Sequence, residues 1–247
     1  MRIWILVAAA VCVSEASATV VRLQAARDNT IFEENGDFSN GIGTGLFAGE
    51  TSVGQKRRGL IAFDLTGIPA GSVINSARLT LRMSRTATGS EPVSLHFALA
   101  SWGEGTSNSD TMGGGGGALA TPGDATWSHR FYEGGTWTTP GGDFRATPSA
   151  VAAVAGIAFY NWSGTDVIAD IQQWVNAPDS NNGWFIIGNE ATNQTAKRFD
   201  TREVATLANR PVLEVDYTVP APGILGVLGL GVLAASRRRR NAGPFRA

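Results

Sequence analysis

The stretch Ala77-Arg78-Leu79-Thr80-Leu81-Arg82-Met83 alternates apolar and polar side chains with a period of two. Successive side chains of a β-strand point to opposite faces of a sheet, so this period predicts a strand whose four apolar residues face a core. Four further stretches predict strands, at 58–64, 93–99, 184–187 and 212–217. Many short strands at roughly even spacing predict an all-β fold, a single antiparallel β-sandwich over residues 19–218.

One segment departs from the strand period and predicts a short helix over residues 167–175. Its apolar residues recur at spacings of one, three, three and one, which places them on a single helical face. Asp166 lies in the N-cap region, and Pro178 predicts that the helix has ended by Asn176. The apolar face consists of Val167, Ile168, Ile171, Trp174 and Val175.

The segment 103–142 is rich in glycine, with five consecutive glycines at 113–117 and few aliphatic residues. This composition predicts a long, flexible insertion between strands. No internal repeat and no linker to a second domain is evident, and about 200 residues suit one domain.

The N-terminus has the features of a signal peptide over residues 1–18. Arg2 provides a positive start, residues 3–13 are apolar, and Ala16-Ser17-Ala18 is a small-x-small cleavage pattern. We therefore expect cleavage between Ala18 and Thr19, an exported chain, and a mature protein without the single cysteine, Cys12. The alternative is that this apolar stretch is a buried element of the fold.

The C-terminal tail, residues 219–247, carries a second signal. The box Pro220-Ala221-Pro222 is followed by an apolar run at 224–235 and by four arginines at 237–240. A proline-rich box, a short transmembrane span and an arginine stop resemble the PEP-CTERM sorting signal of Gram-negative-type bacteria, with Ala221 in place of glutamate. The resemblance implies processing by an exosortase-type enzyme after transient membrane insertion. The alternative is an uncleaved tail anchor.

The body between these two ends is acidic. Six of the 20 basic residues and one of the 21 acidic residues lie in the ends, which leaves 14 basic and 20 acidic residues, a net charge of about −6. An acidic body with two lysines argues against nucleic acid as a partner. A single cysteine excludes an intrachain disulfide and a cysteine-rich zinc site.

A series of short motifs runs through the body in order. The first half contains Arg58, Leu60, Phe63-Asp64, Ile68-Pro69-x-Gly71, Ile74, Ala77, Leu79 and Leu81. The second half contains Trp102-x-Glu104-Gly105, Thr126-Trp127, Asp166-Val167, Trp174, Asn182-Gly183, Phe199-x-Thr201-Arg202-Glu203 and Arg210-Pro211-x-Leu213-x-Val215-x-Tyr217. In order and spacing these motifs resemble the DNRLRE domain family, over roughly residues 24–218.

The resemblance implies a jelly-roll-like β-sandwich in a secreted or surface protein. Members of that family are often attached to polysaccharide-active enzymes, and some are grouped as carbohydrate-binding modules that recognise alginate. This chain departs from the pattern by standing alone and by its glycine-rich insertion after Trp102.

The residues themselves argue against catalysis. The sequence contains no GxSxG, HExxH, P-loop or GxGxxG motif. His96 falls within a predicted strand, which favours a partly buried structural histidine. The adjacent carboxylates Glu33 and Glu34 are better explained as acidic surface than as a glycosidase pair, because neighbouring side chains point to different sides.

Sugar binding suits the composition better, because sugar rings pack on aromatic side chains and their hydroxyls need planar polar partners. We name Trp127, Trp137 and Arg57 as candidate carbohydrate-binding residues. The two tryptophans lie in the polar insertion, where each either forms an exposed platform or pins its own loop. Arg57 and Arg58 either pair with a uronate carboxylate or form internal ion pairs, which we favour slightly for Arg58. Trp174 and Trp184 are expected in the core.

No cofactor and no catalytic residue is assigned. A structural calcium ion is compatible with an acidic, secreted, sugar-binding fold, and Asp28, Glu33, Asp37 and Asp216 lie near the two ends of the domain, but the sequence defines no ligand set. The leading hypothesis is an exported, non-catalytic surface or matrix protein that binds polysaccharide, alginate-like or another exopolysaccharide. The alternatives are a structural extracellular-matrix protein with protein partners and, less favoured, a secreted polysaccharide lyase or hydrolase.

Overall fold

The structure is a computed structural model, and it describes residues 17–34, 36–110 and 115–220. Most of the predicted signal peptide and of the sorting tail therefore lies outside the described residues; of the named processing positions, Ala18, Thr19 and Pro220 are inside them. Within the described ranges no helix is both long enough and apolar enough to cross a membrane.

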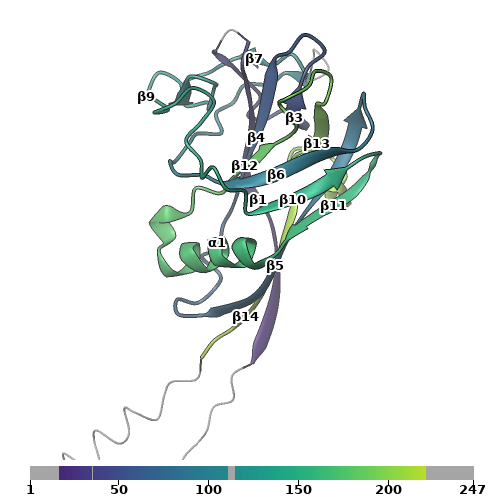
Figure 1. Ribbon diagram of the computed structural model, residues 1–247. Helices are drawn as coiled ribbons and strands as arrows, with labels where there is room; N and C mark the ends of the chain where they lie inside the picture. Colours follow the sequence, from purple (N-terminus) through teal and green to yellow (C-terminus); the bar gives the residue numbers. More distant parts are fainter. Residues whose placement is uncertain (1–16, 35, 111–114, 221–247) are drawn as a thin grey trace, which may run out of the picture.

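The described chain is mostly β-structure with one α-helix (Figure 1). The helix α1 spans Thr165–Asn176, and two short 3₁₀ turns lie at Pro178–Ser180 and Leu207–Asn209. The strands are β1 (Ala18–Phe32), β2 (Phe38–Ser39), β3 (Gly45–Glu50), β4 (Lys56–Phe63), β5 (Val73–Thr86), β6 (Glu91–Phe97), β7 (Ala118–Leu119), β8 (His129–Phe131), β9 (Gly135–Thr136), β10 (Ala150–Val154), β11 (Ala158–Ser163), β12 (Trp184–Ile187), β13 (Lys197–Asp200) and β14 (Val212–Thr218).

Six strands form a closed hydrogen-bonded ring, in the order β4, β3, β13, β5, β14, β1 and back to β4. Two strands close it by changing partners along their length. The first part of β1 pairs with β14, and after an irregularity at Ala25–Arg27 its second part pairs with β4. Likewise β3 pairs with β13 up to Ala48 and with β4 from Gly49, whose φ of 117° is one that residues with a side chain rarely adopt.

The prediction of an all-β antiparallel fold with one short helix is confirmed. The division into two separate facing sheets is not confirmed, because β1 and β3 carry the hydrogen bonding from one side of the core to the other and produce a barrel. The extra strands β12, β6 and β10 extend from β4, while β11 extends from β5.

The main core fills the ring and is closed on one side by α1. The predicted inward residues of β5 are all buried, and Trp162 and Trp184 are 1% and 0% exposed. The helix packs against β5 and contributes Val167, Ile171, Trp174 and Val175 to the same cluster, as predicted. It begins at Thr165, so Asp166 lies in its first turn, where a carboxylate favours the helix dipole, and Gly164 is the N-cap.

A second, smaller core lies on the outer face of β4 and β12. The side chains of β4 alternate between the two cores: Ile61 and Phe63 belong to the main one, Leu60 and Ala62 to the second. A strand buried on both faces explains the continuous apolar run at 60–63. The second core is completed by side chains from the segment that follows β6, among them Trp102, Ala125 and Trp137.

The predicted flexible insertion is therefore a folded cover for this outer face, over residues 103–110 and 115–142. Buried Asp124 holds its backbone by accepting hydrogen bonds from the Thr121 hydroxyl and from the backbone N–H groups of Thr121 and Ser107. Gly105 has a φ of 66°, and a Cβ there would overlap the Asp124 carboxylate. Gly103 and Gly105 thus allow close packing, a role that glycine-rich composition by itself does not distinguish from flexibility.

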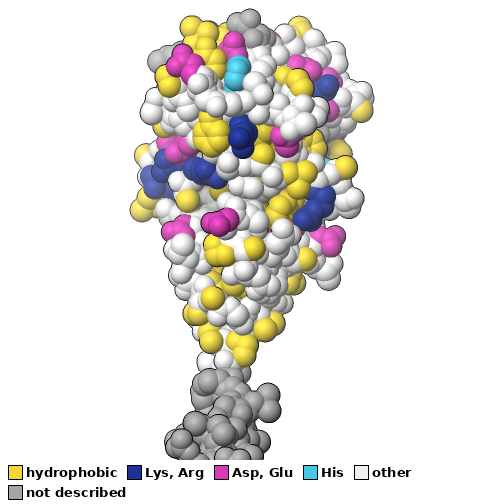
Figure 2. All heavy atoms as spheres, turned by 90° about the vertical axis from the view of Figure 1, so that its left-hand side faces the viewer, with side chains coloured by type: hydrophobic (Ala, Val, Ile, Leu, Met, Phe, Trp, Pro, Cys, Tyr) yellow, Lys and Arg dark blue, Asp and Glu magenta, His cyan; other side chains and the backbone are white. Residues whose placement is uncertain are grey.

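Acidic and basic side chains are interspersed over the face shown in Figure 2, without a large patch of either sign. Many are paired, as in Arg58–Glu190, Arg82–Asp200 and Arg202–Glu104, each at 2.7 Å. The acidic net charge of the body is thus spread over local ion pairs rather than collected in one region.

Candidate functional site: the pocket beside helix α1

Two of the three predicted carbohydrate-binding residues are buried. Trp137 is 4% exposed; its Nε1 donates to the Thr126 carbonyl at 2.8 Å, and its ring packs on Phe185. Of the two alternatives for Trp137, an exposed platform or a ring that pins its own loop, the structure shows the second, because the ring supplies the apolar area that the polar insertion needs to attach to the sheet.

Arg57 is 3% exposed and is also engaged inside the fold. Its guanidinium pairs with Glu34, donates to the carbonyl of Gly115 at 3.2 Å, and lies 4.8 Å from the Phe32 ring centre. Burial is the main cause that lowers the pKa of Arg57, and the Glu34 carboxylate opposes it. A uronate would have to displace Glu34, so Arg57 is not available as a free cation.

Trp127 is half-buried and remains the most accessible of the predicted set. The guanidinium of Arg58 covers its ring, 4.7 Å from the ring centre. Arg58 is itself fixed by two 2.7 Å bonds to Glu190, which confirms the internal ion pair that we favoured for this residue. Of the six tryptophans after residue 18, five are buried, and Trp127 is the exception.

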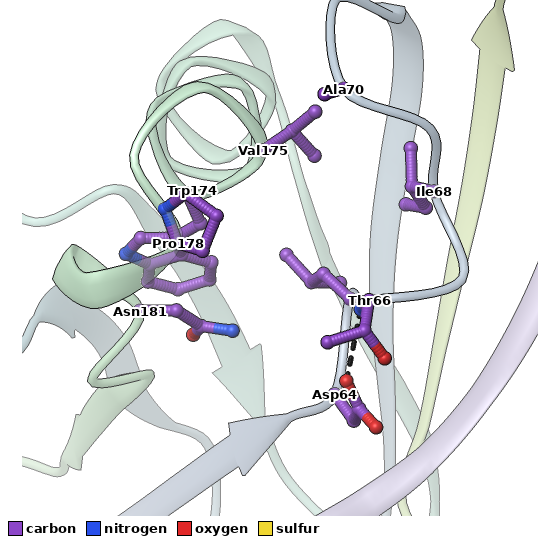
Figure 3. A pocket seen from close by; sticks show the side chains of 9 residues that line it. Asp64, Thr66, Ile68, Ala70, Trp174, Val175, Pro178 and Asn181 are labelled. Carbon is purple, nitrogen blue, oxygen red and sulfur yellow. Dashed lines mark hydrogen bonds between the residues drawn. The ribbon is translucent and has the colours of Figure 1, made fainter.

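The structure also contains a pocket that the sequence did not predict, between α1 and the loop that follows β4 (Figure 3). We call it the α1 pocket; its volume is about 310 Å³, at the lower end of ligand sites. The lining residues are Asp64, Leu65, Thr66, Ile68, Ala70, Trp174, Val175, Pro178 and Asn181.

The walls of the α1 pocket are apolar and its rim is polar. Leu65, Ile68 and Val175 are buried, while Asp64 and Thr66 are exposed. Figure 3 shows Trp174, Pro178 and Asn181 on one side, opposite the segment from Asp64 to Ala70 on the other. An apolar floor with a few polar groups at its edge is the usual composition of a small-molecule site.

Two buried polar atoms of the α1 pocket have no hydrogen-bond partner among the described residues. One is the donor Trp174 Nε1, on a side chain 1% exposed, and the other is the acceptor Asn181 Oδ1. Asn181 is fixed from its other end, where Nδ2 donates to the Phe63 carbonyl at 2.9 Å. Buried groups of this kind are nearly always paired in proteins, so these two atoms are unusual features of the residues that line the α1 pocket.

The rim carboxylate is held in place by its own turn. Asp64 Oδ1 accepts the backbone N–H of Thr66 at 2.9 Å, and this bond is the main cause that lowers the pKa of Asp64. Asp64 is therefore charged at neutral pH. The sequence signal for this part of the site is an aspartate two residues before a threonine at a strand end, typical of an Asx-turn. No comparable signal marks Asn181, which lies 117 residues further along the chain.

The predicted acidic residues are not brought together to hold a metal ion. Asp216 on β14 lies opposite Val20, near the start of β1. Asp28 lies further along β1, opposite Ile61 on β4. Glu33 bonds Lys56, and Asp37 lies 3.4 Å from His129. Among the described residues no group of three or more His, Cys, Asp and Glu side chains is arranged to hold a metal.

His96 is buried, as expected of a structural histidine. Its ring nitrogens lie 2.9 Å from the Ser94 hydroxyl and 2.8 Å from the Arg145 carbonyl oxygen. Burial is the main cause that lowers the pKa of His96, so the ring is neutral at physiological pH. The arrangement ties β6 to the segment after it.

No protein-family model matches the chain, and no curated protein is significantly similar to it in sequence.

Proposed function

We propose that this chain is an exported, non-catalytic protein of the cell surface or extracellular matrix that binds polysaccharide through the α1 pocket. The signal-like residues 1–18 and the sorting-like tail 219–247 support export and processing at the cell surface by an exosortase-type enzyme. The DNRLRE-like order of motifs supports a carbohydrate ligand, because some members of that family are grouped as carbohydrate-binding modules.

The observation that carries the binding proposal is the composition of the α1 pocket, which has apolar walls and a polar rim. The exposed Asp64 carboxylate and Thr66 hydroxyl at the rim can form hydrogen bonds with the hydroxyls of a sugar ring. The C–H face of the same ring would pack against the apolar walls, including Leu65 and Ile68. A small apolar pocket with polar groups at its rim therefore suits a sugar.

The size and charge of the α1 pocket restrict the class of polysaccharide that it could bind. About 310 Å³ accommodates a single sugar unit, at a chain end or a branch, rather than a stretch of polysaccharide lying on a flat platform. The charged Asp64 carboxylate at the rim accepts hydrogen bonds from hydroxyls and repels a uronate. We therefore favour a neutral polysaccharide over alginate.

The same geometry favours binding over catalysis. Glycoside hydrolysis uses two carboxyl groups that flank the scissile bond. Asp64 is the one carboxylate among the nine residues that line the α1 pocket, and it is exposed and charged rather than buried and protonated. A ligand in the pocket would therefore be held without being cleaved.

The test is an affinity-gel screen of residues 17–220 against neutral polysaccharides and alginate, with and without calcium. This fragment contains every described element and both cores. Ala70→Phe fills the α1 pocket from its exposed rim and should weaken binding about tenfold or more, a loss of about 1.4 kcal/mol. Ala191→Phe is the matched control, because Ala191 is exposed and does not line the pocket.

Three outcomes would contradict parts of the proposal. Binding that survives Ala70→Phe but is lost in Trp127→Ala would move the site to the insertion. Stronger binding of alginate than of neutral polysaccharide would overturn the ligand class. If no polysaccharide binds in any condition, the structural-protein alternative replaces the binding function.

A further inference from the structure

The strands β10 and β11 follow one another in the chain, and each has one edge without a partner among the described strands. β10 pairs with β6 only, and β11 pairs with β5 only. In Figure 1 the two strands lie at the right-hand rim of the molecule, and β11 leads into α1. Along an open edge, alternate backbone N–H and C=O groups point outwards and can pair with another strand.

This rim lacks the features that usually protect an edge. Residues 146–165 include no Asp, Glu, Lys, Arg or His, and neither strand contains a proline or a register shift. Instead the rim exposes large apolar side chains, with Val151 57%, Ile157 64% and Phe159 50% exposed. We call residues 150–163 the apolar rim. An uncharged, apolar open edge is a surface suited to strand pairing.

The apolar rim is rigid enough to pair at low entropic cost. The Tyr160 hydroxyl accepts the Ala155 N–H at 3.0 Å and donates to the Gly156 carbonyl at 2.8 Å, which fixes the turn. Trp162, 1% exposed, anchors β11 by donating to the Val93 carbonyl on β6 at 2.8 Å. A preformed edge loses little conformational freedom on association.

We propose that the apolar rim pairs with the same rim of a second copy of this chain. An antiparallel pair of identical strands has a two-fold axis, so an edge of this kind is self-complementary in its backbone. Charged side chains on the edge would face their own copies across that axis and repel. The absence of charge over residues 146–165 removes this repulsion, which is the reason for naming a second copy as the partner.

The strands of five and six residues predict a reversible dimer rather than a permanent one. The experiment is sedimentation equilibrium of residues 17–220 at concentrations up to ~1 mM, the range in which weak association is populated. The double variant Val151→Lys/Phe159→Lys places charges on both strands of the rim. The control Val53→Lys/Leu207→Lys makes the same change in charge at two exposed apolar residues outside the rim, 74% and 61% exposed.

We expect the wild type and the control to dimerise with the same constant, and the rim variant to dimerise at least about tenfold more weakly. Circular dichroism checks that both variants are folded. A wild type that stays monomeric up to ~1 mM would overturn the proposal, as would a dimer that the rim variant leaves unchanged. Polysaccharide binding by the α1 pocket is measured separately, so either proposal can fail without the other.

Discussion

At the scale of single residues, the most unusual group is the fully buried carboxyl of Asp28 on β1. Its Oδ2 accepts the backbone N–H of Arg202 at 2.9 Å, while Oδ1 has no partner among the described residues. Burial is the main cause that raises the pKa of Asp28 well above its usual value, and the nearby Glu203 carboxylate adds to it. The pKa of Glu203 is raised as well, again mainly by burial.

Because its folded-state pKa is raised, Asp28 binds a proton more tightly in the folded protein than in the unfolded chain. Its contribution to stability is complete below the unfolded pKa of about 3.9 and is lost as the pH rises through the folded value. We expect Asp28→Asn, which keeps an acceptor for Arg202, to raise the melting temperature at pH 7 by about 2–4 °C. The variant should also flatten the pH dependence of stability above pH ~4.

Thermal unfolding followed by circular dichroism from pH 4 to pH 8 measures both effects. Asp179→Asn is the control, since Asp179 is exposed at the surface. The explanation fails if Asp28→Asn is less stable than the wild type at pH 7 while remaining as stable at pH 4.

At the scale of elements, α1 is joined to the sheet by a buried carboxylate as well as by its apolar face. Asp170 accepts hydrogen bonds from Trp184 Nε1 at 2.8 Å, from Arg145 at 2.9 Å and from the Ser149 hydroxyl. Asp170→Ala would leave the buried indole N–H and the buried serine without their acceptor. We expect a loss of about 2–4 kcal/mol in the free energy of unfolding.

Urea denaturation measures this loss, and Asp166→Ala on the same helix is the matched control. Asp166 is exposed in the first turn, so its removal should cost less than about 1 kcal/mol. Equal costs for the two variants would show that the helix is held by its apolar face without help from Asp170.

At the scale of the whole molecule, closure of the ring depends on the first seven residues of β1. Residues 18–24 pair with β14, and Val21 and Leu23 pack against the main core. A chain that begins at Ala25 would leave the outer edge of β14 unpaired and expose those core contacts. We expect it to lose about 2–4 kcal/mol of stability relative to the chain that begins at Thr19.

Cleavage between Ala18 and Thr19 would leave nearly all of the β1–β14 pairing intact, so the chain that begins at Thr19 is expected to keep the closed ring. A chain beginning at Ser17 is the control and should match the one beginning at Thr19 in urea midpoint. Equal stability of the Ala25 chain would contradict a role for ring closure in holding the fold together.

The sequence by itself predicted α1 and the five strands β4, β5, β6, β12 and β14, but not β1, β3 and β13, which complete the ring. The period of two at 77–83 and the helical spacing at 167–175 were sufficient because both depend on residues within one or two turns of each other. Both periodicities are local, so they can be read from the sequence without knowing what each face contacts.

Only the tertiary structure decided how the elements close and where a ligand could bind. The ring forms because Val21 pairs with Val215, 194 residues away, and no local pattern states that pairing. The α1 pocket likewise combines Asp64, Trp174 and Asn181 from separate segments. Burial of Trp137 and Arg57 depends on the insertion folding onto β4 and β12. Contacts of this range are set by which apolar faces remain to be covered once the strands have formed, and that is a property of the whole chain.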